Sequence, residues 1–86
     1  MRMLLQQPPA AGAPSTFCRL TLQADLLGGY LLLCESGEMG GRSRVRRSVH
    51  LDHADAIAAF EAARDREIRR GMRITWAEGE RPPQSA

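Results

Sequence analysis

A single stretch of this chain is suited to a long helix, and this limits the folds open to the rest. Residues 54–70 are rich in Ala and contain neither Gly nor Pro, the residues that most disfavour helix interiors. Asp52 can cap the first free amides of such a helix, and Gly71 is a natural C-terminal stop. Because the neighbouring segments are strand-like, the helix is expected to cover one face of a sheet.

The predicted helix has an apolar side and a charged side. The apolar side combines three large residues with two alanines: Ile57, Phe60, Ile68, Ala56 and Ala63. Glu67 is expected to face solvent, as are the basic residues of the last turn, where the helix dipole favours cations.

Four other segments are predicted to be strands, because they alternate between apolar and polar residues or are rich in strand formers. They are residues 16–22, 30–35, 42–51 and 72–76. Short links favour antiparallel pairing of the first three. The predicted fold class is α+β: a small antiparallel sheet of about four strands packed against one helix, in the order strand, strand, strand, helix, strand.

The folded domain is predicted to span residues 16–76. Residues 1–15 and 77–86 are expected to be flexible tails, because their composition offers too little apolar surface to offset the entropy of ordering. The chain of 86 residues suffices for one domain. With no export signal and no apolar run of membrane-spanning length, we expect a cytoplasmic protein without membrane contact.

The two cysteines are expected to lie opposite each other. If Leu22 pairs with Tyr30, Cys18 faces Cys34 across the first two predicted strands. Simple apolar packing is the favoured interpretation, and a regulatory disulfide or a metal pair remains open. His50 and His53 are the only other soft ligands, and no CxxC spacing is present. Neither a metal nor a cofactor is therefore predicted.

Nothing in the sequence indicates catalysis. A domain of this size has a thin core and little material to wall a pocket. No acid–base or nucleophilic constellation is present, and the glycine-rich residues 37–41 lack the Lys and Ser/Thr of a nucleotide-binding loop. The chain is predicted not to be an enzyme, with no catalytic residues and no small-molecule substrate.

Arginines cluster in the third predicted strand. The net charge of +2 is too small to indicate a partner. Four arginines nevertheless lie within six positions with no acid among them: Arg42, Arg44, Arg46 and Arg47. Since arginine forks bind phosphates, these four are the candidate nucleic-acid-binding residues. The alternative is a solvated strand whose arginines pair with Glu35, Glu38 or acids of the helix.

The alternation of this strand assigns its two faces. Val45, Val49 and Leu51 are expected to point into the core, with Arg47 on the same side near an edge. Arg44 and Arg46 then lie side by side on the water-facing side.

The order of these elements and their motifs resembles the WGR domain family. The resemblance rests on residues 17–20, on Asp-Leu-Leu-Gly-Gly-Tyr at 25–30, on 32–35, on 40–44, and on Arg-Arg-Gly-Met-Arg at 69–73. WGR domains occur in poly(ADP-ribose) polymerases and as small stand-alone bacterial proteins. The resemblance implies a WGR-like fold and contact with DNA.

The chain departs from the family in the signature itself. Ser36, Gly37 and Glu38 form the expected signature loop where the family has Trp-Gly-Arg. Ser36 has no ring to stack on a nucleotide, and Glu38 carries the wrong charge for a phosphate. The roles of the family's Trp and Arg therefore cannot be carried over.

Two functions are compatible with these features. The first is a non-catalytic module that contacts DNA phosphates through the arginine-rich strand. The alternative is a protein-interaction or regulatory module that has lost DNA binding, which predicts an exposed apolar patch or a dimer face.

Overall fold

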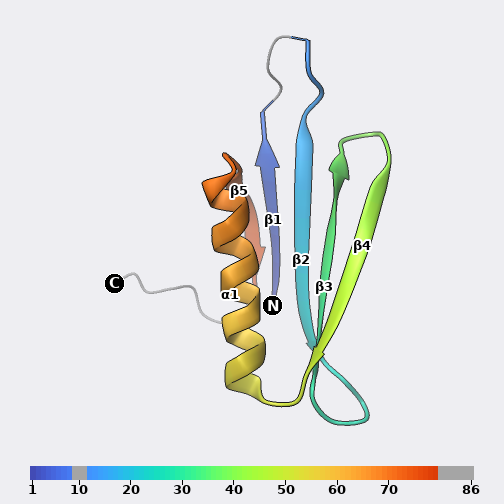
Figure 1. Ribbon diagram of the computed structural model, residues 1–86, viewed down its shortest axis with the longest axis vertical. Helices are drawn as coiled ribbons and strands as arrows, with labels where there is room; N and C mark the ends of the chain where they lie inside the picture. The colour runs from blue at the N-terminus through green and yellow to red at the C-terminus, as the bar shows by residue number, and fades with distance from the viewer. Residues whose placement is uncertain (9–11, 80–86) are drawn as a thin grey trace.

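The computed structural model describes residues 1–8 and 12–79, which form one five-stranded antiparallel sheet and one helix (Figure 1). The elements are β1 (Arg2–Gln7), β2 (Thr16–Ala24), β3 (Tyr30–Glu38), β4 (Ser43–His50), α1 (His53–Arg69) and β5 (Arg73–Glu78). The strand order in the sheet is β4-β3-β2-β1-β5. The predicted α+β class is confirmed, with one strand more than expected.

The extra strand is β1, which lies inside the segment predicted to be an N-terminal tail. It pairs with β2 on one side and β5 on the other, and its Met3 and Leu5 are buried in the core. The prediction of a flexible tail is therefore wrong for Arg2–Gln7. The apolar run is too short to indicate a strand by itself, and it becomes one because two neighbouring strands satisfy its backbone groups. At the other end, β5 continues two residues beyond the predicted boundary at 76.

The residues predicted as tails are only partly described. Residues 9–11 and 80–86 lie outside the described part of the chain, so the expected tails are not assessed there.

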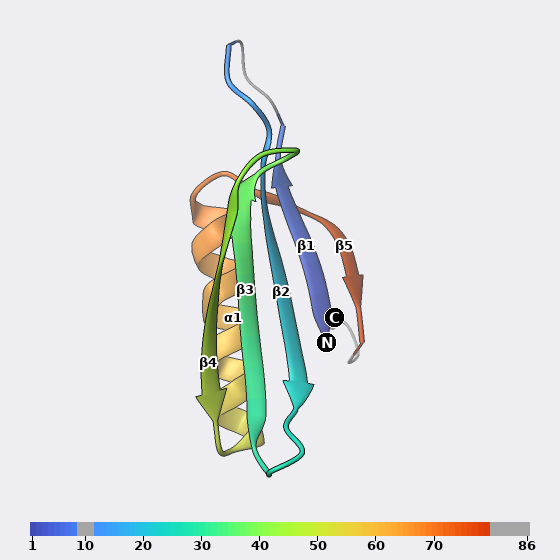
Figure 2. The same cartoon turned by 90° about the vertical axis from the view of Figure 1, so that its right-hand side faces the viewer.

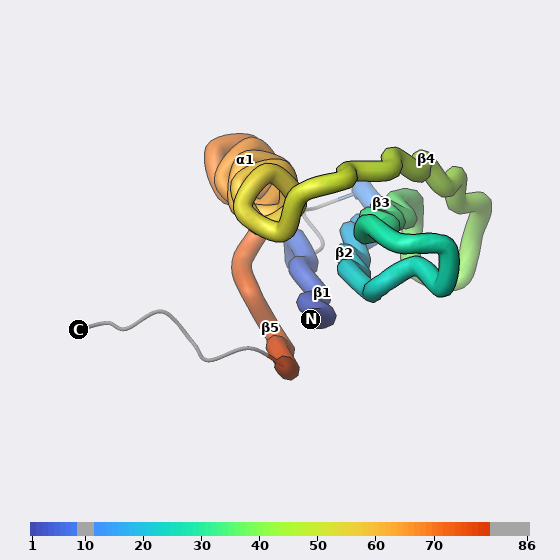
Figure 3. Tube along the Cα trace, turned by 90° about the horizontal axis from the view of Figure 1, so that it is seen from below, coloured from blue at the N-terminus to red at the C-terminus, as the bar shows by residue number. Residues whose placement is uncertain are grey.

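One face of the sheet carries α1 and the other carries no element of the described chain. Figures 2 and 3 show the helix against one side of a curved sheet. The core lies between these two layers and consists of Met3, Leu5, Cys18, Leu20, Leu22, Leu32, Ala56, Phe60 and Ala63.

The helix begins and ends as predicted, but its buried stripe is rotated. Asp52 occupies the N-cap position, but its carboxylate makes no capping hydrogen bond, contrary to the prediction; only its backbone carbonyl takes part, accepting from the Ala56 amide. Gly71 follows the last turn with φ of 102°. Glu67, predicted to face solvent, is only 8% exposed, whereas Ile68 is 43% exposed. The buried stripe runs through Ala56, Phe60, Ala63 and Glu67. The small alanines on that stripe allow the helix to approach the sheet closely. Glu67 lies four residues after Ala63, on the same side of the helix, and is buried with it.

The register between β2 and β3 differs from the prediction by two residues. Leu22 pairs with Leu32, so Cys18 lies opposite Ser36 and Cys34 lies opposite Leu20. The turn is tighter than expected, because the Asp25 amide donates to the Gly29 carbonyl at 2.9 Å and both strands extend into it. The two cysteines are therefore not cross-strand partners, and both are free thiols.

The faces of β4 are reversed relative to the prediction. Directly paired residues of an antiparallel sheet project to the same face, and Arg46 is paired with Cys34, which packs against the core under α1. Arg46 and its neighbour in the row, Arg44, therefore lie on the helix side. Val45 and Val49 lie on the other side and are 59% and 61% exposed. Because β4 is an edge strand, its alternation defines two faces without showing which one is covered.

Candidate anion-binding cleft

A cleft of about 590 Å³ opens between the C-terminal half of α1 and the sheet. Its floor includes Cys18, Cys34 and Ala63. Four arginines line it: Arg44 and Arg46 from β4, Arg66 from α1, and Arg70 at the C-cap of α1. We call this site the arginine cleft. The cleft is thus lined by segments that are far apart in sequence, from β1 to the residues after α1.

Strand alternation and helix periodicity place the two arginines of each pair on the same side of their element, facing the cleft. Arg44 and Arg46 are two residues apart on a strand, so their side chains leave the same face about 7 Å apart. Arg66 and Arg70 are four residues apart on a helix, which places them on one side about 6 Å apart. The strand pair and the helix pair approach the same space from two walls.

Positive charge is in excess in the arginine cleft. Arg70 lies 3.6 Å from the carboxylate of Glu67, which is largely buried in the cleft wall. Within residues 1–8 and 12–79, Arg44, Arg46 and Arg66 form no ion pair. Glu38 is the other carboxylate of the lining. Four guanidinium groups therefore face two carboxylates, and the surplus favours an anionic ligand.

The thiols on the floor are protonated near neutral pH. Burial is the main cause that raises the pKa of Cys18 from 9.0 to about 11, and the charge of Glu67 adds to it. Burial also raises the pKa of Cys34, although the charges of Arg66 and Arg46 oppose the shift. Because a thiolate is the reactive form of cysteine, this floor is better suited to packing than to nucleophilic chemistry.

Cys18 is expected to make the protein less stable at high pH. The unfolded chain releases the thiol proton near pH 9 while the folded chain keeps it to about pH 11, so stability falls as pH rises through this window. Urea unfolding at several pH values between 8 and 11 measures the effect. Cys18→Ala is expected to flatten the decline relative to wild type. Parallel curves for the two proteins would contradict the assignment.

The structure separates the four arginines predicted to act together. Arg44 and Arg46 line the cleft, but Arg47 is paired with Leu33 and lies on the opposite face. Arg42 precedes β4, where its carbonyl accepts from the Glu38 amide at 3.1 Å. The four candidate residues therefore do not form one binding surface, because successive residues of a strand alternate between its faces.

The predicted signature loop is the end of β3, and all three of its residues line the arginine cleft. Gly37 allows the close approach of β4, since an added Cβ would overlap the Arg42 carbonyl and lie 2.6 Å from the Ser43 Cα atom. Ser36 is paired with Arg44. The expected loop instead forms part of the cleft wall.

Sequence reasoning missed the helix half of the site. The sequence predicts that Arg66 and Arg70 face solvent, and both are exposed. Their spacing of four residues also places them on one side of the helix, which is the side that lines the cleft. That spacing is the only sequence signal for the pair, and it carries no information about a strand on the other wall.

Comparison of the chain with models of protein families, with curated proteins and with solved structures finds no match. The WGR resemblance therefore remains a prediction from the sequence. No helix in the described part of the chain is long and apolar enough to cross a membrane. Among the same residues, no cluster of three or more His, Cys, Asp or Glu side chains is placed to hold a metal ion.

Proposed function

We propose that the chain is a non-catalytic module that binds nucleic acid, DNA in the first instance, by holding backbone phosphates in the arginine cleft. The observation that carries the proposal is the convergence of Arg44, Arg46, Arg66 and Arg70 on one cleft. Guanidinium groups bind phosphate oxygens through paired, charge-assisted hydrogen bonds.

The lining favours phosphate contact over base recognition. Phe17 is the only aromatic residue among the side chains that line the cleft, and at 8% exposed it offers no ring for stacking. Binding is therefore expected to be indifferent to sequence and to weaken steeply with salt. The WGR resemblance agrees with DNA as the polymer, and a cytoplasmic location agrees with two free thiols.

Neutralising the β4 pair is expected to weaken binding. The variant Arg44→Gln/Arg46→Gln should lower affinity for a short labelled DNA by at least roughly tenfold and reduce the salt slope by about 2, one unit for each lost phosphate contact. Fluorescence anisotropy across a salt series measures both quantities, on single-stranded and duplex probes.

The matched control is Arg42→Gln/Arg47→Gln, which removes the same charge from the same region without touching the cleft lining. It should stay within about threefold of wild type at moderate salt. Equal losses in the two variants would show binding by diffuse charge. If wild type does not bind at low salt, the proposal fails.

A further inference from the structure

We infer that the arginine cleft binds RNA more tightly than DNA, because Glu67 accepts a hydrogen bond from a ribose 2′-hydroxyl beside the bound phosphates. The inference rests on the proposed function, in which the two polymers share the phosphate contacts with the arginines. It assigns the preference between them to one carboxylate in the cleft wall. The 2′-hydroxyl is the backbone group by which a protein distinguishes RNA from DNA.

Glu67 is a buried charge that lacks a hydrogen-bond donor. Its side chain is only 10% exposed, and it lies in the cleft wall above a floor that includes Cys18 and Ala63. The ion pair that it forms with Arg70 joins Oε2 and Nη1 at 3.6 Å, which is longer than a charged hydrogen bond. Within residues 1–8 and 12–79, no group donates a hydrogen bond to this carboxylate. Its capacity to accept hydrogen bonds is therefore unfilled.

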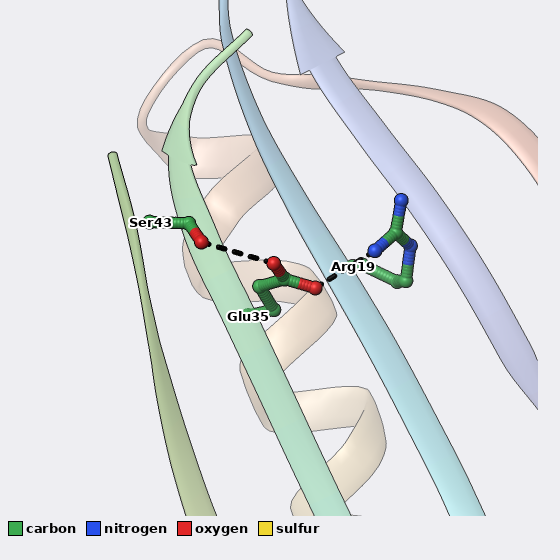
Figure 4. A network of polar contacts seen from close by, with 3 residues as sticks. All are labelled: Arg19, Glu35 and Ser43. Atoms are coloured by element: carbon green, nitrogen blue, oxygen red, sulfur yellow. Dashed lines mark hydrogen bonds and ion pairs between the residues drawn. The ribbon is translucent and has the colours of Figure 1, made fainter. Parts of the chain in front are cut away.

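Glu35 shows a carboxylate of the same fold with its partners in place. It lies on the opposite face of the sheet, where Oε1 accepts from Arg19 Nη1 at 2.7 Å and Oε2 accepts from the Ser43 hydroxyl at 3.0 Å (Figure 4). The Glu35 side chain is 31% exposed, so water also reaches it. Glu67 is more deeply buried and has no such donors. Because a buried carboxylate is costly without donors, its position is explained best by donors that a ligand supplies.

The carboxylate of Glu67 is open to the cleft. Within the described residues, every side-chain nitrogen or oxygen that is sealed from the surface has a hydrogen-bond partner. Since the Glu67 oxygens have none, they are not sealed, and the surface that they reach is that of the cleft. A ligand held by the four arginines can therefore contact this carboxylate directly.

A carboxylate beside the arginines suits a ligand that carries both phosphates and donors. The backbone of DNA offers acceptors only, and the negative charge of Glu67 opposes its phosphates. The backbone of RNA carries a hydroxyl donor next to each phosphate. Arg70 follows Glu67 by three residues, so the cation and the acceptor lie on the same side at the end of α1. This juxtaposition matches a phosphate with a neighbouring 2′-hydroxyl.

The test compares three labelled single strands that differ only at the 2′ position. All three carry uracil as their base and have equal length, with a 2′-hydroxyl, a 2′-hydrogen or a 2′-fluorine on every sugar. The 2′-fluoro strand keeps the sugar pucker of RNA but has no donor. Wild type should bind the hydroxyl strand roughly ten- to a hundredfold more tightly than either of the others, the effect of one hydrogen bond to a charged group. Fluorescence anisotropy at moderate salt measures the three dissociation constants.

Glu67→Met removes the acceptor at nearly constant side-chain volume. It should bring the three dissociation constants within about threefold of one another, the range left when the strands share only phosphate contacts. The matched control is Glu38→Met, which removes the same charge from an exposed residue of the cleft lining. Both variants should bind the 2′-hydrogen strand more tightly than wild type does, since each loses a negative charge. Only Glu38→Met should keep the preference for the hydroxyl strand.

The comparison among strands uses wild type and does not depend on whether a variant folds, which circular dichroism establishes for both. The inference is overturned if wild type binds the three strands equally, if the 2′-fluoro strand binds as tightly as the hydroxyl strand, or if Glu67→Met keeps the preference. Equal binding of all three strands still leaves the phosphate contacts of the proposed function intact. If none of them binds at low salt, the proposed function fails and this inference fails with it.

Discussion

Leu5→Ala is expected to lower the free energy of unfolding by about 2–5 kcal/mol. Leu5 is fully buried in β1, where it is paired with Cys18 of β2 and Ile74 of β5. Its removal leaves a cavity in a thin core, because Leu5 and Leu20 are the largest fully buried side chains among the described residues. Urea or thermal unfolding followed by circular dichroism measures the loss.

This loss is a large fraction of the total free energy of unfolding expected for the domain. Small proteins unfold with about 5–15 kcal/mol in total, and a chain of this length belongs near the lower end. Loss of β1 would also leave β5 without its only partner strand. The variant is therefore expected to be partly unfolded at physiological temperature.

Leu26→Ala is the matched control, because it makes the same chemical change at a side chain that is fully exposed in the turn between β2 and β3. This variant should change the free energy of unfolding by no more than about 0.5 kcal/mol. Equal stability of the two variants would mean that residues 2–7 form a tail after all.

Reversing one charge on each wall of the arginine cleft is expected to abolish nucleic-acid binding at moderate salt. The variant Arg46→Glu/Arg66→Glu places two carboxylates where phosphates are proposed to bind. Each lost charged hydrogen bond is worth about 1.5–3 kcal/mol, so affinity should fall by at least roughly 100-fold. Anisotropy with labelled DNA measures it.

The control Arg47→Glu/Arg69→Glu changes the net charge by the same amount on the same two elements. Arg47 lies on the open side of β4, and Arg69 is not among the residues that line the cleft. The control variant should lose less than about tenfold in affinity, which is the effect expected from long-range charge alone. If the control variant loses as much affinity for DNA as the cleft variant, overall charge governs binding.

Local signals in the sequence predicted local structure well. The helix lies within the limits set by Asp52 and Gly71, because capping positions and glycine depend on neighbouring residues only. The four predicted strands that follow residue 15 agree in kind; β2, β3 and β5 end two or three residues beyond their predicted ends, and β4 is one residue shorter at each end.

The failures share one cause, which is dependence on distant parts of the chain. Met3 and Leu5 join the core because β2 and β5 flank them, and nothing near them in sequence signals this. The β2–β3 register depends on how tightly residues 25–29 turn, and a slip of two residues keeps the same side chains on the same face. The predicted alternation could not detect such a slip.

The sequence by itself determined the α+β class, the limits of the helix and the presence of an arginine-rich strand, because propensity, capping and alternation act over a few residues. Only the tertiary structure decided that β1 completes the sheet, that α1 covers the face bearing Arg44 and Arg46, and that Arg66 and Arg70 stand across from them. Alternation divides a strand into two faces, and the helix that covers one of them is positioned by the packing of the whole core.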